Sequence, residues 1–286
     1  MTMTGEIQGT KKEFIKIFNE MCYSRSGWQV WSDLISTMAC SIANAVDRSE
    51  PRFSNREKEY AHCIERLGGV DKPAKCFAIV VEALERNPEQ DFLGELYMEL
   101  ELGNHWKGQF FTPYCVCKMM SEITVGDVDR QIEEKGYISI CDPACGAGAT
   151  LIAAVNSMRN AKHNFQNHVL FVGQDIDRIV GMMCYIQLSL LGCAGYICIG
   201  NTITNPLVGH VLFPQEMEGQ ELWITPMFQS NVWAWRRLFH SLGSLGGSAD
   251  TKQTIEKEHY YMFLILKRRR KCNGSRYKTF RFGAER

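Results

Sequence analysis

The sequence predicts an α/β protein with an open sheet, preceded by a helical domain. Three observations support this fold class. Residues 137–157 have the pattern of a short strand, a glycine-containing turn and an apolar helix. A second apolar strand, VLFVGQDID, follows and ends in Asp175 and Asp177. From residue 11 to about residue 102, in contrast, apolar side chains recur at helical spacing.

The helical pattern divides into about five segments. Glycine and proline interrupt it at Pro51, Gly68 and Pro88, as expected at helix boundaries. The predicted helices cover residues 12–21, 28–46, 55–67, 72–84 and 90–102. We therefore expect residues 1–105 to form a helical bundle that leads into the sheet.

The glycine turn is the first candidate site. A β-branched and aromatic strand at 137–141 is followed by Asp142, Pro143, Gly146 and Gly148, and then by a helix from residue 149 to about 158. Glycine lets the backbone approach a ligand closely, and the first turn of the helix offers unpaired N–H groups. Asp142 ends the strand, at the crevice where open α/β sheets bind ligands.

The acids at the strand ends indicate what kind of ligand fits. Asp175 ends the second strand, where a carboxylate can bind ribose hydroxyls. The turn reads GAG rather than GxGxxG, and Asp142 would oppose the pyrophosphate of NAD or FAD. A nucleoside with a cationic end fits better, and S-adenosylmethionine carries both an ammonium and a sulfonium group.

Four segments in a fixed order resemble the N-6 adenine DNA methyltransferases, and most of all the modification subunits of type I restriction systems. They are GQFFTP at 108–113, DPACGAGATLI at 142–152, GQDID at 173–177 and GN at 200–201. The likeness covers roughly residues 106–228. It implies a Rossmann-like sheet that binds S-adenosylmethionine, placed at residues 106–266, and methyl transfer to the exocyclic amine of adenine in DNA.

The resemblance also implies a set of cofactor-binding residues. In the family, the FFTP loop lies over the methionine part of the cofactor. Asn201 follows a third short strand at 196–199, where the family usually has an acid that meets adenine; the amide keeps a carbonyl but loses the charge. The implied residues are Gln109, Phe111, Thr112, Asp142, Pro143, Ala144, Gly146, Gly148, Asp175, Ile176 and Asn201.

The acceptor half of the site departs from the family pattern. Amino-methylating enzymes hold the target amine with Asn or Asp, two prolines and an aromatic residue that stacks on the flipped base. The nearest match here is Thr225-Pro226-Met227-Phe228, after a predicted strand in ELWI. The threonine hydroxyl can accept a hydrogen bond, although it has no side-chain carbonyl. The predicted catalytic residues are thus Thr225, Pro226 and Phe228, whereas the NP pair at residues 205–207 is interpreted as a turn.

Composition limits the possible partners. The chain has 286 residues, with 32 Lys plus Arg and 32 Asp plus Glu, so no global field attracts it to a polyanion. DNA binding would need a local patch or a partner. Basic and aromatic residues alternate in the C-terminal segment 267–286, which suits either phosphate binding or a solvated tail. No long segment remains to recognise a DNA sequence, so a separate specificity subunit is expected.

Cysteine usage and hydropathy favour the cytoplasm. The 12 cysteines lie scattered in predicted helices and strands, without CxxC pairs or Cys/His spacing suited to zinc. We expect free thiols and no metal. A predicted strand at 259–266 is apolar but short, and no signal peptide or stretch of 18 apolar residues occurs, so no membrane span is expected.

Three functions remain open at this point. The first is an adenine-specific DNA methyltransferase that depends on S-adenosylmethionine. The second is a cofactor-binding but catalytically weak relative that serves as a DNA-binding or assembly module. The third is a methyltransferase that acts on a protein glutamine. The position of the FFTP segment ahead of the glycine turn favours the first.

Overall fold

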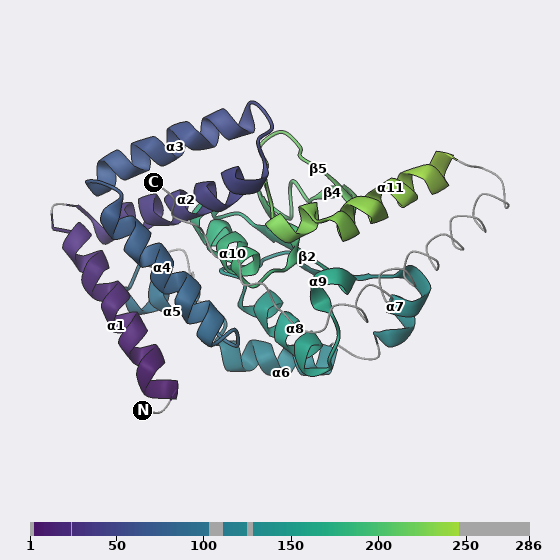
Figure 1. Ribbon diagram of the computed structural model, residues 1–286, viewed down its shortest axis with the longest axis horizontal. Coiled ribbons are helices and arrows are strands. Elements are labelled where there is room, and N and C mark those ends of the chain that lie inside the picture. Colours follow the sequence, from purple (N-terminus) through teal and green to yellow (C-terminus); the bar gives the residue numbers. More distant parts are fainter. Residues whose placement is uncertain (1–2, 24, 103–110, 125–127, 246–286) are drawn as a thin grey trace, which may run out of the picture. The chain divides into compact units, whose positions relative to one another are not determined.

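The computed structural model describes residues 3–23, 25–102, 111–124 and 128–245 (Figure 1). The chain divides into two compact units, residues 1–234 and 235–286. The predicted strand at 259–266 and the basic segment 267–286 lie outside the described residues. Helix α11 (Asn231–Leu245) begins in the first unit and ends in the second.

The N-terminal region consists of five helices, as predicted. They are α1 (Met3–Met21), α2 (Gly27–Val46), α3 (Arg52–Leu67), α4 (Asp71–Arg86) and α5 (Phe92–Glu99). The Ser26 hydroxyl caps α2 by accepting a hydrogen bond from the Gln29 N–H. Helix α3 ends at Gly68, whose φ of 79° is easily adopted by glycine. Helix α2 is the centre of the bundle and packs against α1, α3 and α4.

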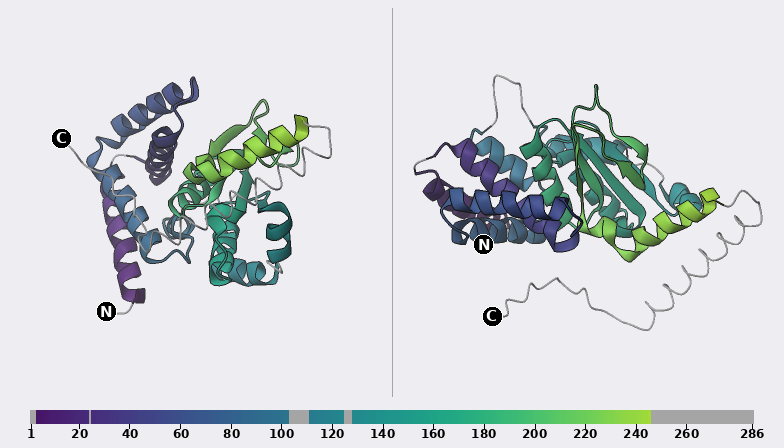
Figure 2. Two further views of the ribbon diagram at one scale, coloured as in Figure 1. Left: turned by 45° about the vertical axis from the view of Figure 1, so that its right-hand side comes forward. Right: turned by 90° about the horizontal axis from the view of Figure 1, so that it is seen from above.

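The sheet confirms the predicted α/β class. Strands β1 (Ile138–Asp142), β2 (Val169–Asp175) and β3 (Ala194–Ile199) are parallel neighbours in that order (Figures 1 and 2). Helix α8 (Ala149–Asn160) connects β1 to β2, and α10 (Arg178–Leu190) connects β2 to β3. Shorter elements complete this part: α6 (Tyr114–Thr124), α7 (Asp129–Lys135) and α9 (Phe165–His168).

The sheet is buried on both faces by alternating side chains. On β2, Phe171 belongs to the core that includes α8 and α10, whereas Leu170 and Val172 belong to a second cluster with Tyr196 and Trp233. This alternation follows from the two-residue repeat of a strand. Because both faces are covered, these strands are apolar at nearly every position, as expected for a parallel sheet.

The last strand of the sheet runs in the opposite direction. Strand β6 (Glu221–Ile224) pairs with β3 in antiparallel register and is followed by the 3-10 helix η2 (Pro226–Gln229). A separate hairpin of β4 (Val208–His210) and β5 (Phe213–Gln215) precedes it. Of the described helices, none has the length and apolarity needed to cross a membrane.

The helical region and the sheet share one hydrophobic core. Helix α2 packs against α10, and their buried side chains belong to the same cluster. Arg178 adds an ionic link, because its guanidinium lies 2.8 Å from Glu59 on α3 and 2.6 Å from Glu221 on β6. The proposed boundary at residue 105 lies in the segment 103–110, outside the described residues, and stays a prediction.

Candidate functional site

The glycine turn connects β1 to α8 in a conformation that requires glycine. Gly146 and Gly148 have φ angles of 56° and 99°, in the left-handed region that other residues rarely adopt. A Cβ on Gly148 would also lie 2.8 Å from the Cys184 sulfur. Backbone at the start of α8 therefore stays uncovered by side chains at these two positions.

Two carboxylates lie at this edge of the sheet. Asp142 is the last residue of β1, and its Oδ1 accepts a hydrogen bond of 3.0 Å from the Ala144 N–H. Asp175 ends the neighbouring strand β2, and its two oxygens accept bonds of 2.9 Å from the N–H groups of Gly146 and Asp177. The turn is thus held by the acid of the next strand, as the carboxyl ends of parallel strands allow.

Electrostatics at this edge favour a positively charged ligand. Burial raises the pKa of Asp175, and the charges of Asp177 and Asp142 raise it further. Hydrogen bonds from Asp177 and Gly146 act in the opposite direction. Because like charges lie close together here, a bound cation would relieve their repulsion, whereas a phosphate would increase it.

The loop after β3 reaches the same edge. Asn201 follows β3, and its side-chain oxygen accepts bonds from the N–H groups of Ile203 and Thr204 at 2.9 and 3.1 Å. The Thr202 hydroxyl donates to the Pro143 carbonyl at 2.6 Å and so joins this loop to the glycine turn. Asn201 therefore shapes the loop with the carbonyl oxygen that the sequence assigns to adenine.

Two apolar side chains are exposed at this edge. Ile176 follows Asp175 and is 69% exposed, and Ile203 in the loop after β3 is 91% exposed. Isoleucines so open to water offer an apolar surface for a planar ring. Ile176 was expected at the site. Ile203 was not, because a single isoleucine in a polar loop has no periodic pattern.

The FFTP segment reaches the turn through Phe111. The Phe111 ring would lie 3.6 Å from a Cβ on Gly146, so it covers this glycine. It also stacks on Tyr97 of α5, with ring centroids 5.3 Å apart. Thr112 is exposed just before α6. Gln109 lies outside the described residues.

A buried polar link supports the turn from the helical region, and the sequence analysis missed it. Asp91 caps α5 by accepting a bond of 2.9 Å from the Gly94 N–H. Gln187 of α10 donates to Asp91 at 2.7 Å and to the Ala147 carbonyl at 2.9 Å. Burial raises the pKa of Asp91 to about 6. An Asp before an apolar helix signals the cap, but nothing in the sequence pairs it with Gln187.

The three predicted acceptor residues lie at the other end of the sheet. In the antiparallel pairing of β6 with β3, Ile224 is opposite Tyr196 and Glu221 is opposite Ile199. Thr225 therefore lies beside the start of β3, whereas the glycine turn and Asn201 lie beyond the carboxyl ends of β1 and β3. The structure does not bring Thr225, Pro226 and Phe228 to the carboxylates.

Burial gives a second reason to correct this assignment. Thr225 is 0% exposed, and its hydroxyl donates to the Cys193 carbonyl at 2.7 Å and accepts from the Gly195 N–H at 2.9 Å. Pro226 begins η2, and the buried Phe228 ring packs against Tyr196 and Trp233. In this arrangement these residues cannot hold an amine beside a methyl donor that is bound at the glycine turn.

We expect Thr225→Val to lower stability without affecting methyl transfer by the folded protein. The substitution removes a buried hydroxyl and leaves its backbone partners short of hydrogen bonds, which costs about 1–3 kcal/mol. Denaturant titration measures the loss, and Thr124→Val at an exposed position of α6 is the control. Normal stability combined with lost activity in Thr225→Val would restore the acceptor role.

Comparisons with known proteins agree with the fold and the glycine-turn motif. The family model described as "N-6 DNA Methylase" matches residues 89–266, which is more than half of the chain. Among solved structures, the chain is similar to a type I restriction-modification system methyltransferase subunit from Streptococcus thermophilus, with 13% identity and a TM-score of 0.37. That match covers 73% of this chain and 61% of the subunit, less than two thirds of its length. The comparison with curated proteins gives no match. The family match shows that this chain belongs to the N-6 DNA methylase family.

Proposed function

We propose that this protein is a catalytic subunit that methylates the exocyclic amine of adenine in DNA, with S-adenosylmethionine as cofactor and a separate subunit for sequence recognition. One observation carries the proposal. The carboxylates of Asp142 and Asp175 lie at the carboxyl ends of neighbouring strands, around a turn that keeps its backbone uncovered through Gly146 and Gly148. This combination fits a nucleoside with a positively charged end.

The residues at this edge fit the cofactor part by part. Each Asp175 oxygen accepts one backbone hydrogen bond, and a carboxylate oxygen can accept two, so Asp175 can bind ribose hydroxyls and still hold the turn. Asp142 would face the ammonium group, and Ile176 with Asn201 would border adenine. When bound, the cofactor supplies a methyl group on an electrophilic sulfonium.

The remaining predicted positions shape the methionine end. Phe111 already covers Gly146, and we assign the Phe111–Thr112 segment, with Gln109, to the methionine part of the cofactor. Pro143 and Ala144 form the backbone between Asp142 and the glycines, where the Ala144 N–H fixes the Asp142 carboxylate. The protein's contribution to the rate would be mainly to orient donor and acceptor.

The position of the acceptor residues favours a second candidate. Thr225 and Phe228 are buried away from the glycine turn, so the described residues supply no group that is placed to hold the target amine there. A cofactor-binding module without transfer activity would have this arrangement. Under the first candidate, the amine is held by residues outside the described ranges or by a partner chain.

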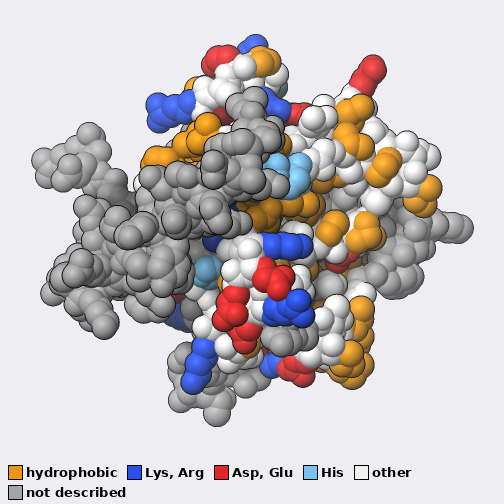
Figure 3. Space-filling view, turned by 90° about the vertical axis from the view of Figure 1, so that its right-hand side faces the viewer, with side chains coloured by type: hydrophobic (Ala, Val, Ile, Leu, Met, Phe, Trp, Pro, Cys, Tyr) orange, Lys and Arg blue, Asp and Glu red, His pale blue; other side chains and the backbone are white. Residues whose placement is uncertain are grey.

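Surface charge is consistent with DNA binding that is local or shared. In the view of Figure 3, the described Lys and Arg side chains lie among Asp and Glu side chains, without a broad area of one sign. The net charge of the chain is zero. A partner that reads the DNA sequence would also contribute part of the phosphate contacts.

Transfer of a labelled methyl group tests the proposal. The chain is incubated with methyl-labelled S-adenosylmethionine and unmethylated duplex DNA, and the nucleosides are separated by chromatography. We expect label in N6-methyladenine, and its loss in Asp175→Asn. Bound cofactor without transfer would support the module instead, and label in protein alone would support glutamine methylation. A chain that binds no cofactor would contradict all three.

A further inference from the structure

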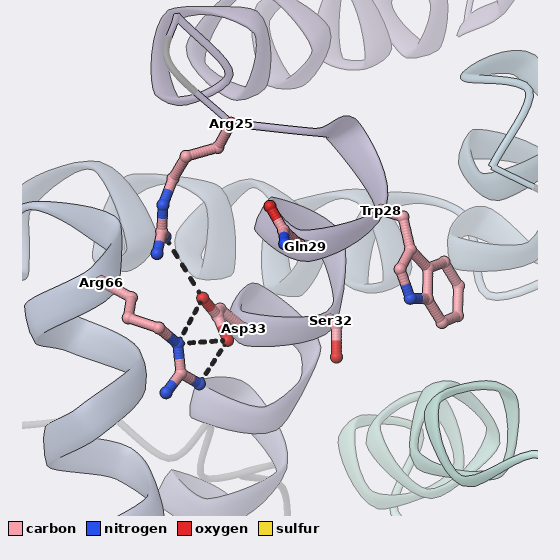
Figure 4. Close-up of a pocket in the computed structure, with 6 residues that line it drawn as sticks. All are labelled: Arg25, Trp28, Gln29, Ser32, Asp33 and Arg66. Carbon is pink, nitrogen blue, oxygen red and sulfur yellow. Dashed lines mark hydrogen bonds and ion pairs between the residues drawn. The ribbon is translucent and has the colours of Figure 1, made fainter.

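A cleft between the start of α2 and the end of α3 has the features of an anion site. Its volume is about 180 Å³, and it is lined by Arg25, Trp28, Gln29, Ser32, Asp33 and Arg66 (Figure 4). The two arginines approach Asp33 from different elements, Arg25 from the segment before α2 and Arg66 from α3. The cleft belongs to the helical region and is separate from the glycine turn.

The two arginines do not have the same structural role. Arg66 forms a paired contact with the buried Asp33 carboxylate, with Nε at 3.0 Å and Nη2 at 2.6 Å from its oxygens. This contact already joins α3 to α2 and neutralises Asp33. Arg25 adds one longer bond of 3.3 Å from Nη1. Two guanidinium groups therefore share one carboxylate, which leaves the cleft with one excess positive charge.

The cleft also has unused donors. Among the described residues, no partner bonds to Nη1 of Arg66 or to Nε and Nη2 of Arg25. The side chains of Gln29 and Ser32 likewise bond to no described residue. An Asp that merely joined two helices would not need these extra donors, whereas an oxyanion would use them.

Aromatic side chains lie beside these donors. Trp28 lines the cleft and is 40% exposed, and its ring meets Tyr97 edge to face at 6.2 Å. Tyr23, two residues before Arg25, is almost fully exposed. Guanidinium groups next to exposed aromatic rings can bind the phosphate and the sugar or base of one nucleotide. A small inorganic anion would not use the rings.

We propose that this cleft binds a phosphate group of the DNA backbone, with Arg25 and Arg66 as the donors and Asp33 as the residue that positions them. The inference rests on the proposed function, because it assumes that the chain contacts DNA. It locates the contact on the helical region, which has one concentrated positive site despite the neutral chain. As a phosphate contact it carries no sequence preference.

Arg25→Gln is the variant of choice, because Arg66 continues to neutralise Asp33 and the fold is retained. Fluorescence anisotropy with a labelled duplex measures affinity at several salt concentrations. We expect about fivefold weaker binding and a salt dependence reduced by about one ion. Arg25→Lys keeps the charge and should lie between the two. The control is Arg130→Gln, which removes an equal charge from an exposed pair with Glu134 on α7.

Three outcomes would overturn the inference. The first is unchanged affinity and salt dependence in Arg25→Gln. The second is an Arg25-dependent binding of inorganic phosphate alone, with DNA binding unaffected. The third is a wild-type chain that binds S-adenosylmethionine but no DNA, which leaves the cofactor site intact. Failure of the proposed function is recognised separately, by absent cofactor binding in the same preparation.

Discussion

Replacing Asp142 by asparagine is expected to weaken the binding of S-adenosylmethionine at least about tenfold. The variant loses the charge that we assign to the cofactor's ammonium group, and a hydrogen bond to a charged group contributes about 1.5–3 kcal/mol. The asparagine oxygen can still accept the bond from the Ala144 N–H, so the turn keeps its conformation. Isothermal titration with the cofactor measures the change.

Asp177→Asn is the matched control for this titration. Asp177 lies at the same edge of the sheet, but its Oδ1 caps α10 through the N–H groups of Ile179 and Val180. Asparagine caps helices about as well as aspartate, so stability should change little. We expect the control to bind within about threefold of the wild type, since an exposed charge that does not contact the ligand has little effect. Equal affinities in wild type and Asp142→Asn would remove Asp142 from the site.

Asp91→Asn is expected to stabilise the protein at neutral pH and not at pH 4. Burial raises the pKa of Asp91 from 3.8 to about 6, so the folded state binds its proton more tightly than the unfolded state does. The contribution of this group to stability is therefore greatest below pH 3.8, and it decreases as the pH rises to about 6. This decrease amounts to about 3 kcal/mol, at 1.36 kcal/mol per pKa unit.

The asparagine does not ionise, so the variant lacks this loss. Its oxygen can still accept the bonds from Gln187 and from the Gly94 N–H. Denaturant titrations of both proteins at pH 4, 5, 6 and 7 should show a difference that grows with pH. Asp71→Asn, at an exposed position of α4, is the control and should change stability by no more than about 0.5 kcal/mol at any pH. A difference that does not depend on pH would contradict the ionisation of a buried Asp91.

Local patterns in the sequence were sufficient to predict the parallel part of the sheet. The strand, glycine turn and helix at residues 137–158 are β1 and α8, and the apolar run that ends in Asp175 is β2. These predictions succeeded because each element is specified by nearby residues. The meeting of the two acids then follows from the geometry of parallel neighbours, whose carboxyl ends share one edge.

The direction of β6 could not be predicted in this way. ELWI reads as a strand, and its position after Asn201 suggested a parallel neighbour. Direction and pairing are set by the path of the chain through the β4–β5 hairpin, which brings β6 back along β3. Thr225 illustrates the consequence, because its composition suits either an acceptor or a buried cap on the start of β3. The contact of Asp91 with Gln187 is missed for a related reason, since the pair is 96 residues apart in the sequence.

The central claim is that the carboxyl edge of the sheet binds S-adenosylmethionine, and a crystal structure of the protein with this cofactor tests it most directly. We predict that the ribose hydroxyls lie within hydrogen-bond distance of the Asp175 carboxylate, with the ammonium group beside Asp142 and the methionine chain near Phe111 and Gly146. Cofactor found elsewhere, such as beside Thr225 at the opposite edge, would contradict the account.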